Sequence, residues 1–303
     1  FWLNNLNRTH TRHRPFSKNK LFRSINSIMS DSKRIAVVTG SNKGIGFEIL
    51  KKLAAGGFKT ILAARNEELG TAAALSAAEH GDVEFRCLDI SNPDSIKAFV
   101  SNFERDFGRC DVLVNNAGIA FKGADPTPHA QQVRPTFTTN YYGTTNMTVA
   151  MLPLLRKGVD ARVVTVSHHL KALSDPVKVE YITSEQRTVD DVNAFATEFI
   201  TDVEAGNHLE KGWPNKNLGM SQLCKVAFLK ALARQEKATV GSNVLFVMAC
   251  PGHCRTDMSS MNGDNSAEEG ARTPAWLAML QLKEGDADAM MGKFYSKQAE
   301  VEW

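Results

Sequence analysis

Short apolar runs alternate with amphipathic stretches along the chain from about residue 34 onward. Runs rich in Val, Ile and Leu between turn residues are typical of buried strands, and apolar positions three and four residues apart are typical of a helix face. The pattern predicts strands at 35–39, 58–64, 83–88, 112–115, 162–166, 243–249 and 292–296, and helices at 44–55, 67–79, 92–107, 144–155, 218–236 and 267–282. A polar, charged stretch at 170–212 interrupts the series. The alternation predicts one doubly wound α/β domain with a parallel sheet and helices on both faces.

The first predicted strand runs directly into a glycine-rich turn that opens a helix. Gly40, Gly44 and Gly46 stand at the spacing G-x-x-x-G-x-G. In a dinucleotide site such glycines make the turn, let the backbone approach a pyrophosphate, and let helix and strand pack closely. The pyrophosphate then lies on the N-terminal amides of the helix, where partial positive charge is concentrated. The motif alone also fits a plain strand-to-helix turn, whereas the pattern of the whole chain favours a Rossmann-type domain.

The end of the second predicted strand bears on the choice of cofactor. An NAD site usually carries an acid there, which holds the ribose hydroxyls. Residues 61–65 read Ile-Leu-Ala-Ala-Arg and contain no acid. The guanidinium of Arg65 can bind a 2′-phosphate, and Lys43 can add a second positive charge. We therefore predict NADP(H) rather than NAD, the alternative being that Arg65 is an ordinary surface arginine.

Length and composition set further limits. With 303 residues, 43% of them apolar, the chain is long enough for one large α/β domain. It contains no apolar run of the roughly 18 residues that a membrane span needs. Its five cysteines have no C-x-x-C spacing, which argues against a disulfide framework or a zinc module and fits a reducing compartment. Adjacent strand residues point to opposite faces, so the pair His168-His169 predicts no metal site.

Charge is distributed unevenly between the start of the chain and the rest. Residues 1–30 carry six Lys or Arg and no Asp or Glu, so the remaining 30 basic and 33 acidic residues give the body a net charge of −3. A body of this charge has no basic footprint for a nucleic acid. We divide the chain into a leader, residues 1–30, and a cofactor-binding domain, residues 31–303.

The leader has two interpretations. Leu21, Phe22, Ile25 and Ile28 share one helical face in a segment without acids, as in a transit peptide for the mitochondrion or another organelle. Alternatively, Met29 is the true start, residues 1–28 are translated leader sequence, and the protein is cytoplasmic.

Several motifs resemble the short-chain dehydrogenases/reductases. They are Thr39-Gly40-x-x-x-Gly44-x-Gly46, Asn115-Asn116-Ala117-Gly118, Asn140 and Pro251-Gly252. Longer runs are similar to the monomeric NADPH-dependent carbonyl reductases of this family: Asn115 through Lys122, Ala124-Asp125-Pro126-Thr127-Pro128, Gly212-Trp213-Pro214, Cys250 through Met258, and Gly292 through Trp303. The resemblance covers about residues 33–303. It implies NADPH-dependent reduction of ketones, aldehydes or quinones, and an insertion at about 170–212 that covers the usual dimer face and keeps the protein a monomer.

The resemblance also implies which residues hold the cofactor. Residues of the glycine turn and of the strand ends would line its diphosphate, adenosine and nicotinamide parts. The cofactor-binding residues, including Arg65, are Gly40, Asn42, Lys43, Gly44, Ile45, Gly46, Arg65, Asp89, Ile90, Asn116, Gly118, Pro251, Gly252 and Thr256.

The reaction centre of the family is altered in this chain. In the family, the Tyr of a Tyr-x-x-x-Lys motif donates a proton, the Lys lowers the pKa of that Tyr, and a Ser after the fifth strand holds the substrate oxygen. In register with Gly212-Trp213-Pro214, the Tyr and Lys places hold Leu218 and Gln222, and His168 stands at the Ser place. Of the family's catalytic places, Asn140, which orients the Lys, matches the motif.

The substitutions predict weak or lost carbonyl reduction. Leu218 has no proton to give, and Gln222 can hydrogen-bond a ribose hydroxyl but carries no charge. Loss of one general acid lowers the rate by a factor of about 10²–10⁴. The Tyr and the Lys act together, so the costs of losing them are not simply added. His168 is a replacement acid, or it merely caps the strand. A shift of three residues would offer Ser221 and Lys225 instead, but it breaks the register.

These substitutions leave three functions open. The chain is a weakened carbonyl reductase, an NADP(H)-binding pseudoenzyme that acts as a sensor or partner protein, or a non-functional copy.

Overall fold

The computed structural model describes residues 33–168 and 172–303. Arg34–Trp303 forms one compact unit. The predicted leader at 1–30 lies outside the described residues. In the described part of the chain, no helix is both long and apolar enough to cross a membrane.

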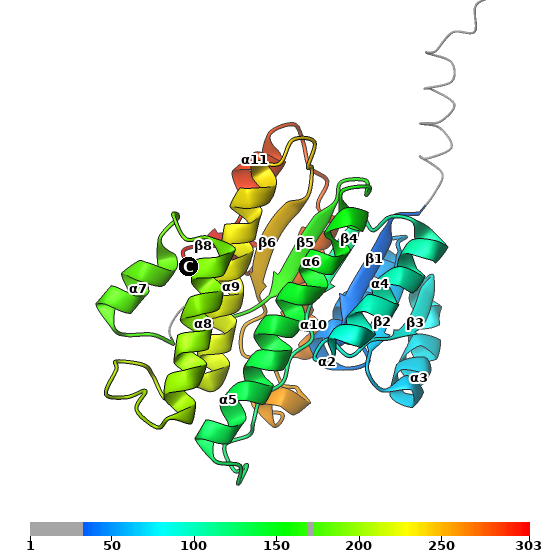
Figure 1. Ribbon diagram of the computed structural model, residues 1–303. Coiled ribbons are helices and arrows are strands. Elements are labelled where there is room, and N and C mark those ends of the chain that lie inside the picture. Colours follow the sequence, from blue (N-terminus) through cyan, green and yellow to red (C-terminus); the bar gives the residue numbers. More distant parts are fainter. Residues whose placement is uncertain (1–32, 169–171) are drawn as a thin grey trace, which may run out of the picture. The chain divides into compact units, whose positions relative to one another are not determined.

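One sheet runs through this unit (Figure 1). Within the described residues it has eight strands in the order β3-β2-β1-β4-β5-β6-β7-β8. Neighbouring strands are parallel, except that β8 is antiparallel to β7. The strands are β1 (Ile35–Thr39), β2 (Lys59–Ala64), β3 (Val83–Cys87), β4 (Val112–Asn115), β5 (Arg162–Val166), β6 (Leu245–Cys250), β7 (Lys293–Ser296) and β8 (Ala299–Val301). The predicted doubly wound α/β fold is confirmed, and the sheet departs from a fully parallel one in its last strand.

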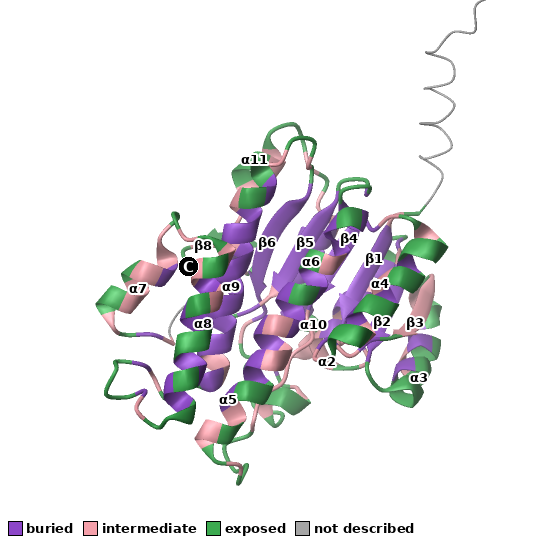
Figure 2. Ribbon diagram, viewed as in Figure 1, coloured by how far each residue is buried: buried purple, intermediate pink, exposed green. Residues whose placement is uncertain are grey.

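Helices cover both faces of the sheet because side chains of a strand alternate between its two faces. The helices are α2 (Gly44–Ala55), α3 (Glu67–Ala77), α4 (Pro93–Phe107), α5 (His129–Phe137), α6 (Thr144–Leu155), α7 (Pro176–Thr183), α8 (Val189–Glu204), α9 (Asn217–Lys237), α10 (Ala267–Met279) and α11 (Asp286–Met290). On β1, Val37 belongs to the apolar core shared with α4, α6 and α9, whereas Ala36 and Val38 belong to the core shared with α2 and α10. Figure 2 shows the central strands buried between these two layers.

Two helical regions differ from the prediction. The helix predicted at 144–155 is the end of a longer run, in which α5 continues through a π-helical turn, η2 (Thr138–Gly143), into α6. Pro135 lies inside α5 and obscured its pattern, because proline normally breaks a helix. The polar stretch at 170–212 contains α7 and α8. α8 begins with a capping box of Thr188 and Asp191, which marks its N-terminus.

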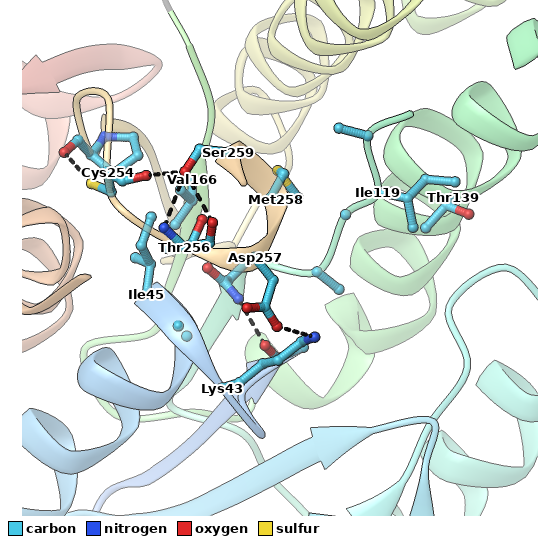
Figure 3. A pocket seen from close by; sticks show the side chains of 18 of the residues that line it. Lys43, Ile45, Ile119, Thr139, Val166, Cys254, Thr256, Asp257, Met258 and Ser259 are labelled. Atoms are coloured by element: carbon cyan, nitrogen blue, oxygen red, sulfur yellow. Dashed lines mark hydrogen bonds and ion pairs between the residues drawn. The ribbon is translucent and has the colours of Figure 1, made fainter. Parts of the chain in front are cut away.

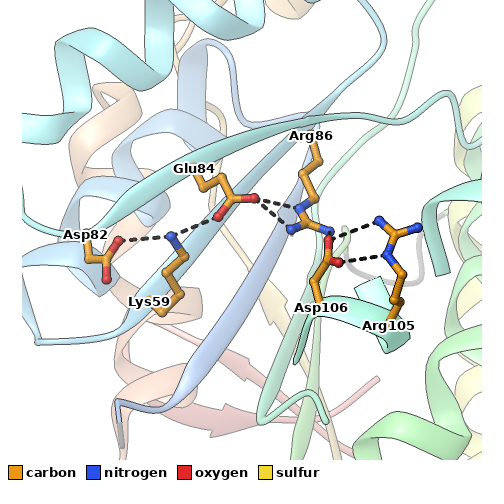
Figure 4. Close-up of polar contacts among 6 residues, drawn as sticks. All are labelled: Lys59, Asp82, Glu84, Arg86, Arg105 and Asp106. Carbon is orange, nitrogen blue, oxygen red and sulfur yellow. Dashed lines mark hydrogen bonds and ion pairs between the residues drawn. The ribbon is translucent and has the colours of Figure 1, made fainter. Parts of the chain in front are cut away.

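The outer edge of the sheet at β3 carries a ladder of charged side chains (Figure 4). The amine of Lys59 lies 3.1 Å from Asp82 and 2.9 Å from Glu84. Arg86 continues the ladder, at 2.7 Å from Glu84 and 2.9 Å from Asp106. Charged side chains on an edge strand oppose pairing with another sheet. This edge therefore serves the stability of the fold, and the candidate site lies elsewhere.

Candidate cofactor and reaction site

A cavity of about 630 Å³ opens beside the carboxyl ends of the strands. It lies where the strand order reverses between β1 and β4, the switch point at which doubly wound sheets bind ligands. Every residue that the sequence analysis assigns to the cofactor lines it, and so do His168, Leu218 and Gln222. The structure thus brings these predicted residues together, while their contact with a cofactor stays a prediction.

The glycine turn after β1 requires the absence of side chains. Gly40 and Gly44 have φ angles of 63° and 60°, in the left-handed region that favours glycine. A Cβ atom on Gly46 would lie 2.3 Å from Asn116 Nδ2 and 2.7 Å from the carbonyl oxygen of Gly40. Asn116 Nδ2 donates to the carbonyl oxygens of Thr39 and Gly40 at 3.0 and 3.1 Å. These hydrogen bonds therefore hold the turn against the loop that follows β4.

The N-terminus of α2 adjoins this turn. Lys43 precedes the helix, and its side chain makes no capping hydrogen bond. The first amides of a helix have no partners within the helix, so they offer donors and partial positive charge to an anion. Gly44, Ile45 and Gly46, the first residues of α2, all line the cavity. The cavity therefore contains the kind of site that the glycine motif predicts for a pyrophosphate.

Three charged side chains of the lining bear on the choice of cofactor. Arg65, which follows β2, is exposed, and within the described residues its guanidinium has no ion-pair partner. Lys43 is already paired, because its Nζ lies 2.6 Å from Asp257 Oδ2 (Figure 3). The two side chains are 64% and 66% exposed. The hydrogen bond from Lys43 lowers the pKa of Asp257. The pairing of Lys43 with this acid could not be predicted from the sequence, because Asp257 lies 214 positions further along the chain.

The loop after β6 is held in shape by its own hydrogen bonds (Figure 3). Ser259 Oγ donates to the carbonyl oxygen of Cys254 at 2.7 Å and accepts from the amide of Thr256 at 3.1 Å. Cys254 Sγ donates to the carbonyl oxygen of Pro251 at 3.2 Å. Gly252 has a φ angle of 73°, which favours glycine at this position. The loop thus presents a fixed surface at the part of the cavity that the resemblance assigns to the nicotinamide.

The residues that the resemblance assigns to the reaction centre lie on the wall formed by the end of β5 and by α9. Leu218 and Gln222 are one helical turn apart on α9, and both line the cavity. Ser167 Oγ donates to Gln222 Oε1 at 3.0 Å. His168 follows on the same strand end, where it is exposed and lines the cavity. The wall therefore carries an apolar side chain and a neutral amide at the two places to which the resemblance assigns a phenol and an ammonium.

Asn140 is absent from the cavity lining and lies fully buried in η2. Its Oδ1 accepts from the amide of Ile119 at 2.8 Å, and its Nδ2 donates to the carbonyl oxygen of Ile119 at 2.9 Å. Nδ2 also lies 3.4 Å from Ser221 Oγ of α9. Asn140 thus fixes the loop after β4 and contacts α9, the helix that carries Leu218 and Gln222. A π-helical turn within a helix is frequent at functional sites.

Lys225 is a residue of this wall that the sequence analysis set aside. Its side chain is 3% exposed, yet it lines the cavity. Its Nζ donates to the carbonyl oxygen of Val166 at 2.9 Å, and burial lowers the pKa of the amine to about 7. Its spacing could have indicated its place on this wall. Lys225 lies two helical turns after Leu218 and one turn after Gln222, so the three residues share a helix face.

Comparisons with known proteins establish the family. The model of the short chain dehydrogenase family matches residues 34–199, and the chain belongs to this family. Carbonyl reductase (NADPH) 1 of Mus musculus is 38% identical over 283 residues, which cover 91% of this chain and 100% of that protein. The enzyme of the same name from Homo sapiens is 35% identical over 285 residues, again 91% of this chain and 100% of that protein. The resemblance to carbonyl reductases drawn from the sequence is therefore confirmed.

Solved structures give the same fold. Salutaridine reductase from Papaver somniferum superposes with a TM-score of 0.77 at 27% identity, over 87% of this chain and 99% of that chain. Menthone neomenthol reductase from Mentha piperita superposes with a TM-score of 0.72 at 27% identity, over 88% of this chain and 99% of that chain.

Proposed function

We propose that this chain binds NADP(H) and reduces ketones, aldehydes or quinones to alcohols, at a rate far below that of an enzyme with the intact family reaction centre. The observation that carries the proposal is the cavity at the β1–β4 switch point, which all the predicted cofactor residues line. Membership of the family and the NADPH-dependent relatives support it. The glycine turn fits a dinucleotide, because it leaves backbone and not side chains at the cavity wall.

The residues that would hold the cofactor come from successive strand ends. The first amides of α2 would hold the diphosphate, and Arg65 would hold the 2′-phosphate with its planar fork. Asp89 and Ile90 would flank the adenine, and Pro251 and Thr256 would hold the nicotinamide end. When bound, NADPH supplies the hydride for the reduction.

The composition of the wall formed by β5 and α9 accounts for the low rate. Leu218 contributes no proton, and Gln222 contributes hydrogen bonds without charge. The hydroxyl of Ser167 is turned toward Gln222 Oε1, to which it donates. A developing alkoxide would therefore lack much of the acid and electrostatic support that a complete reaction centre gives.

The insertion at 170–212 supports a monomer. α8 packs against both α5 and α9, as Figure 1 shows. Phe199 of α8 contacts Phe137 of α5, with 5.5 Å between ring centroids, and Trp213 at 5.5 Å. Trp213 Nε1 donates to Asp202 Oδ2 of α8 at 2.8 Å. The faces of α5 and α9 that dimeric members of the family use would thus be covered by the chain itself.

A second candidate function is NADP(H) binding without turnover, as a sensor or partner protein. The observation that favours it is Leu218, an apolar side chain at the place of the proton donor on the cavity wall. The two functions share the cofactor site and differ only in the reaction.

Two measurements on the purified chain separate these functions. Titration by cofactor fluorescence should show tighter binding of NADPH than of NADH, and equal affinity would contradict the cofactor assignment. Consumption of NADPH in the presence of a generic diketone or quinone should be slow but measurable. Binding with no consumption at any pH would favour the second candidate.

A further inference from the structure

The amine of Lys225 is an unusual group to find on this wall. It is almost completely buried, and within the described residues it donates a hydrogen bond of 2.9 Å to the carbonyl oxygen of Val166. An ammonium group has three N–H donors, and burying it without matching acceptors or a counter-ion is costly. Packing alone does not explain a lysine in such a position, because an apolar residue would fill the same space at a lower cost in free energy.

The place of this amine connects it to the reaction centre. Val166 is followed directly by Ser167 and then by His168, the position where the family holds the substrate oxygen. On α9, side chains lean toward the N-terminus of the helix, which brings the amine of Lys225 back toward Gln222. The amine therefore contacts the strand end that leads into Ser167 and His168, and the side chain lines the same cavity as His168, Leu218 and Gln222.

Within the described residues, the titratable groups on the elements next to Lys225 give its amine no counter-charge. On α9 burial raises the pKa of the Cys224 thiol, and in η2 burial raises the pKa of the Tyr141 phenol, so both stay neutral near pH 7. β6 contributes the buried Cys250 thiol, and the end of β5 contributes His168. Burial lowers the pKa of Lys225, and no carboxylate within the described residues offsets this effect.

We propose that Lys225 is the proton donor of this reaction centre, in place of the missing phenol; the inference rests on the proposed carbonyl reduction. In the step, the carbonyl carbon accepts the hydride from NADPH and the electron pair of the C=O π bond moves onto oxygen. That oxygen takes a proton from the ammonium group of Lys225. The products are the alcohol, NADP⁺ and a neutral lysine amine, which regains its proton from water.

The proposal predicts a definite pH dependence. The ammonium form is the acid, and the pKa of the amine is about 7. The active form is therefore present below pH 7 and is lost as the pH rises through 7. An ordinary lysine would stay protonated to about pH 10 and would give no such decline near neutrality.

The first test compares the pH profile of kcat in the unmodified chain and in Lys225→Met. The variant keeps the volume of the wall and should bind NADPH with unchanged affinity, because the proposed role is in proton transfer. We expect kcat at pH 6 to fall about a hundredfold and its decline through pH 7 to disappear. Lys230→Met is the matched control, since Lys230 lies on the same helix over the ring of Trp303 and outside the cavity lining.

Other results of this test would overturn the proposal. One is an unchanged profile in Lys225→Met, and another is a decline that His168→Ala abolishes and Lys225→Met does not. A chain that binds NADPH but shows no turnover at pH 6 also overturns it, and this result leaves NADP(H) binding intact. Failure to bind NADPH would instead overturn the proposed function itself.

A second measurement does not depend on activity. In protein labelled with ¹³C-lysine, the Cε resonance that is missing from Lys225→Met identifies this side chain. Its titration midpoint should lie near pH 7, and addition of NADPH should shift the resonance because the cofactor enters the cavity that the side chain lines. A midpoint above pH 9, or a resonance insensitive to NADPH, would contradict the assignment.

Discussion

Lys43 and Asp257 join two sides of the cofactor cavity through an ion pair of 2.6 Å. Lys43 belongs to the glycine turn after β1, whereas Asp257 belongs to the loop after β6 (Figure 3). The amine that the sequence analysis assigned to the 2′-phosphate thus already has an anionic partner. A 2′-phosphate would compete with Asp257 for it.

Asp257→Asn should therefore strengthen the binding of NADPH. The expected gain is about two- to fivefold, because exposed ion pairs are weak. NADH has no 2′-phosphate, so its affinity should change less. Fluorescence titrations of both cofactors measure the effect, and an equal gain for NADH would show that Asp257 does not act through Lys43 on the phosphate.

Arg65→Asp should lower the preference for NADPH over NADH by about 10- to 100-fold, the range of charge-assisted hydrogen bonds. The variant removes a cation that has no ion-pair partner within the described residues and adds an acid where NAD sites carry one. Arg105→Asp is a charge-matched control, because Arg105 lies on α4 outside the cavity lining. The same titrations apply, and an unchanged preference would make Arg65 an ordinary surface residue.

Gly46→Ala should reduce NADPH affinity more than tenfold and lower the thermal stability of the protein. Its Cβ would lie 2.3 Å from Asn116 Nδ2 and 2.7 Å from a backbone oxygen, so the turn would have to shift. Gly123→Ala is the matched control, because a Cβ there meets nothing within 4 Å. Calorimetric titration and thermal melting of both variants decide the point. If Gly46→Ala bound NADPH with the affinity of the unmodified chain, the cofactor would not need a close approach of the backbone at Gly46.

Light scattering should find a monomer at micromolar concentration. The physical reason is that α8 packs against both α5 and α9, and under the proposed function these are the helices whose faces a dimer would use. A stable dimer would mean that the insertion leaves another face open for pairing.

Much of the fold could be predicted from the sequence because its signals are local. β1, β4 and β5 have the predicted bounds, since strands buried on both faces are continuous apolar runs. α8 was overlooked although Phe195 and Phe199 stand at helical spacing, because its five acidic residues continue the polar, charged composition of the surrounding stretch. The antiparallel β8 is only three residues long and is formed by pairing with β7 rather than by its own pattern.

In the candidate site, too, features with a local signal could be predicted and contacts between distant parts of the chain could not. The place of the glycine turn and of Arg65 at the cavity could be predicted because each follows directly after a strand with a clear local pattern, while their contact with a cofactor stays a prediction. The ion pair of Lys43 with Asp257 joins residues 214 positions apart, so no window of the sequence contains it. The burial of Lys225 depends on the contact of α9 with the end of β5, which no local pattern contains. In register with Gly212-Trp213-Pro214, the family motif assigns no role to this position.

Restoration of the reaction centre shows whether a complete reductase scaffold carries an altered centre at His168, Leu218 and Gln222. The measurement is NADPH consumption with a diketone by the triple variant His168→Ser, Leu218→Tyr and Gln222→Lys, beside the unmodified chain. The account predicts that turnover rises by about 10²-fold or more while NADPH affinity stays similar. A folded triple variant that binds NADPH but turns over no faster than the unmodified chain would contradict it.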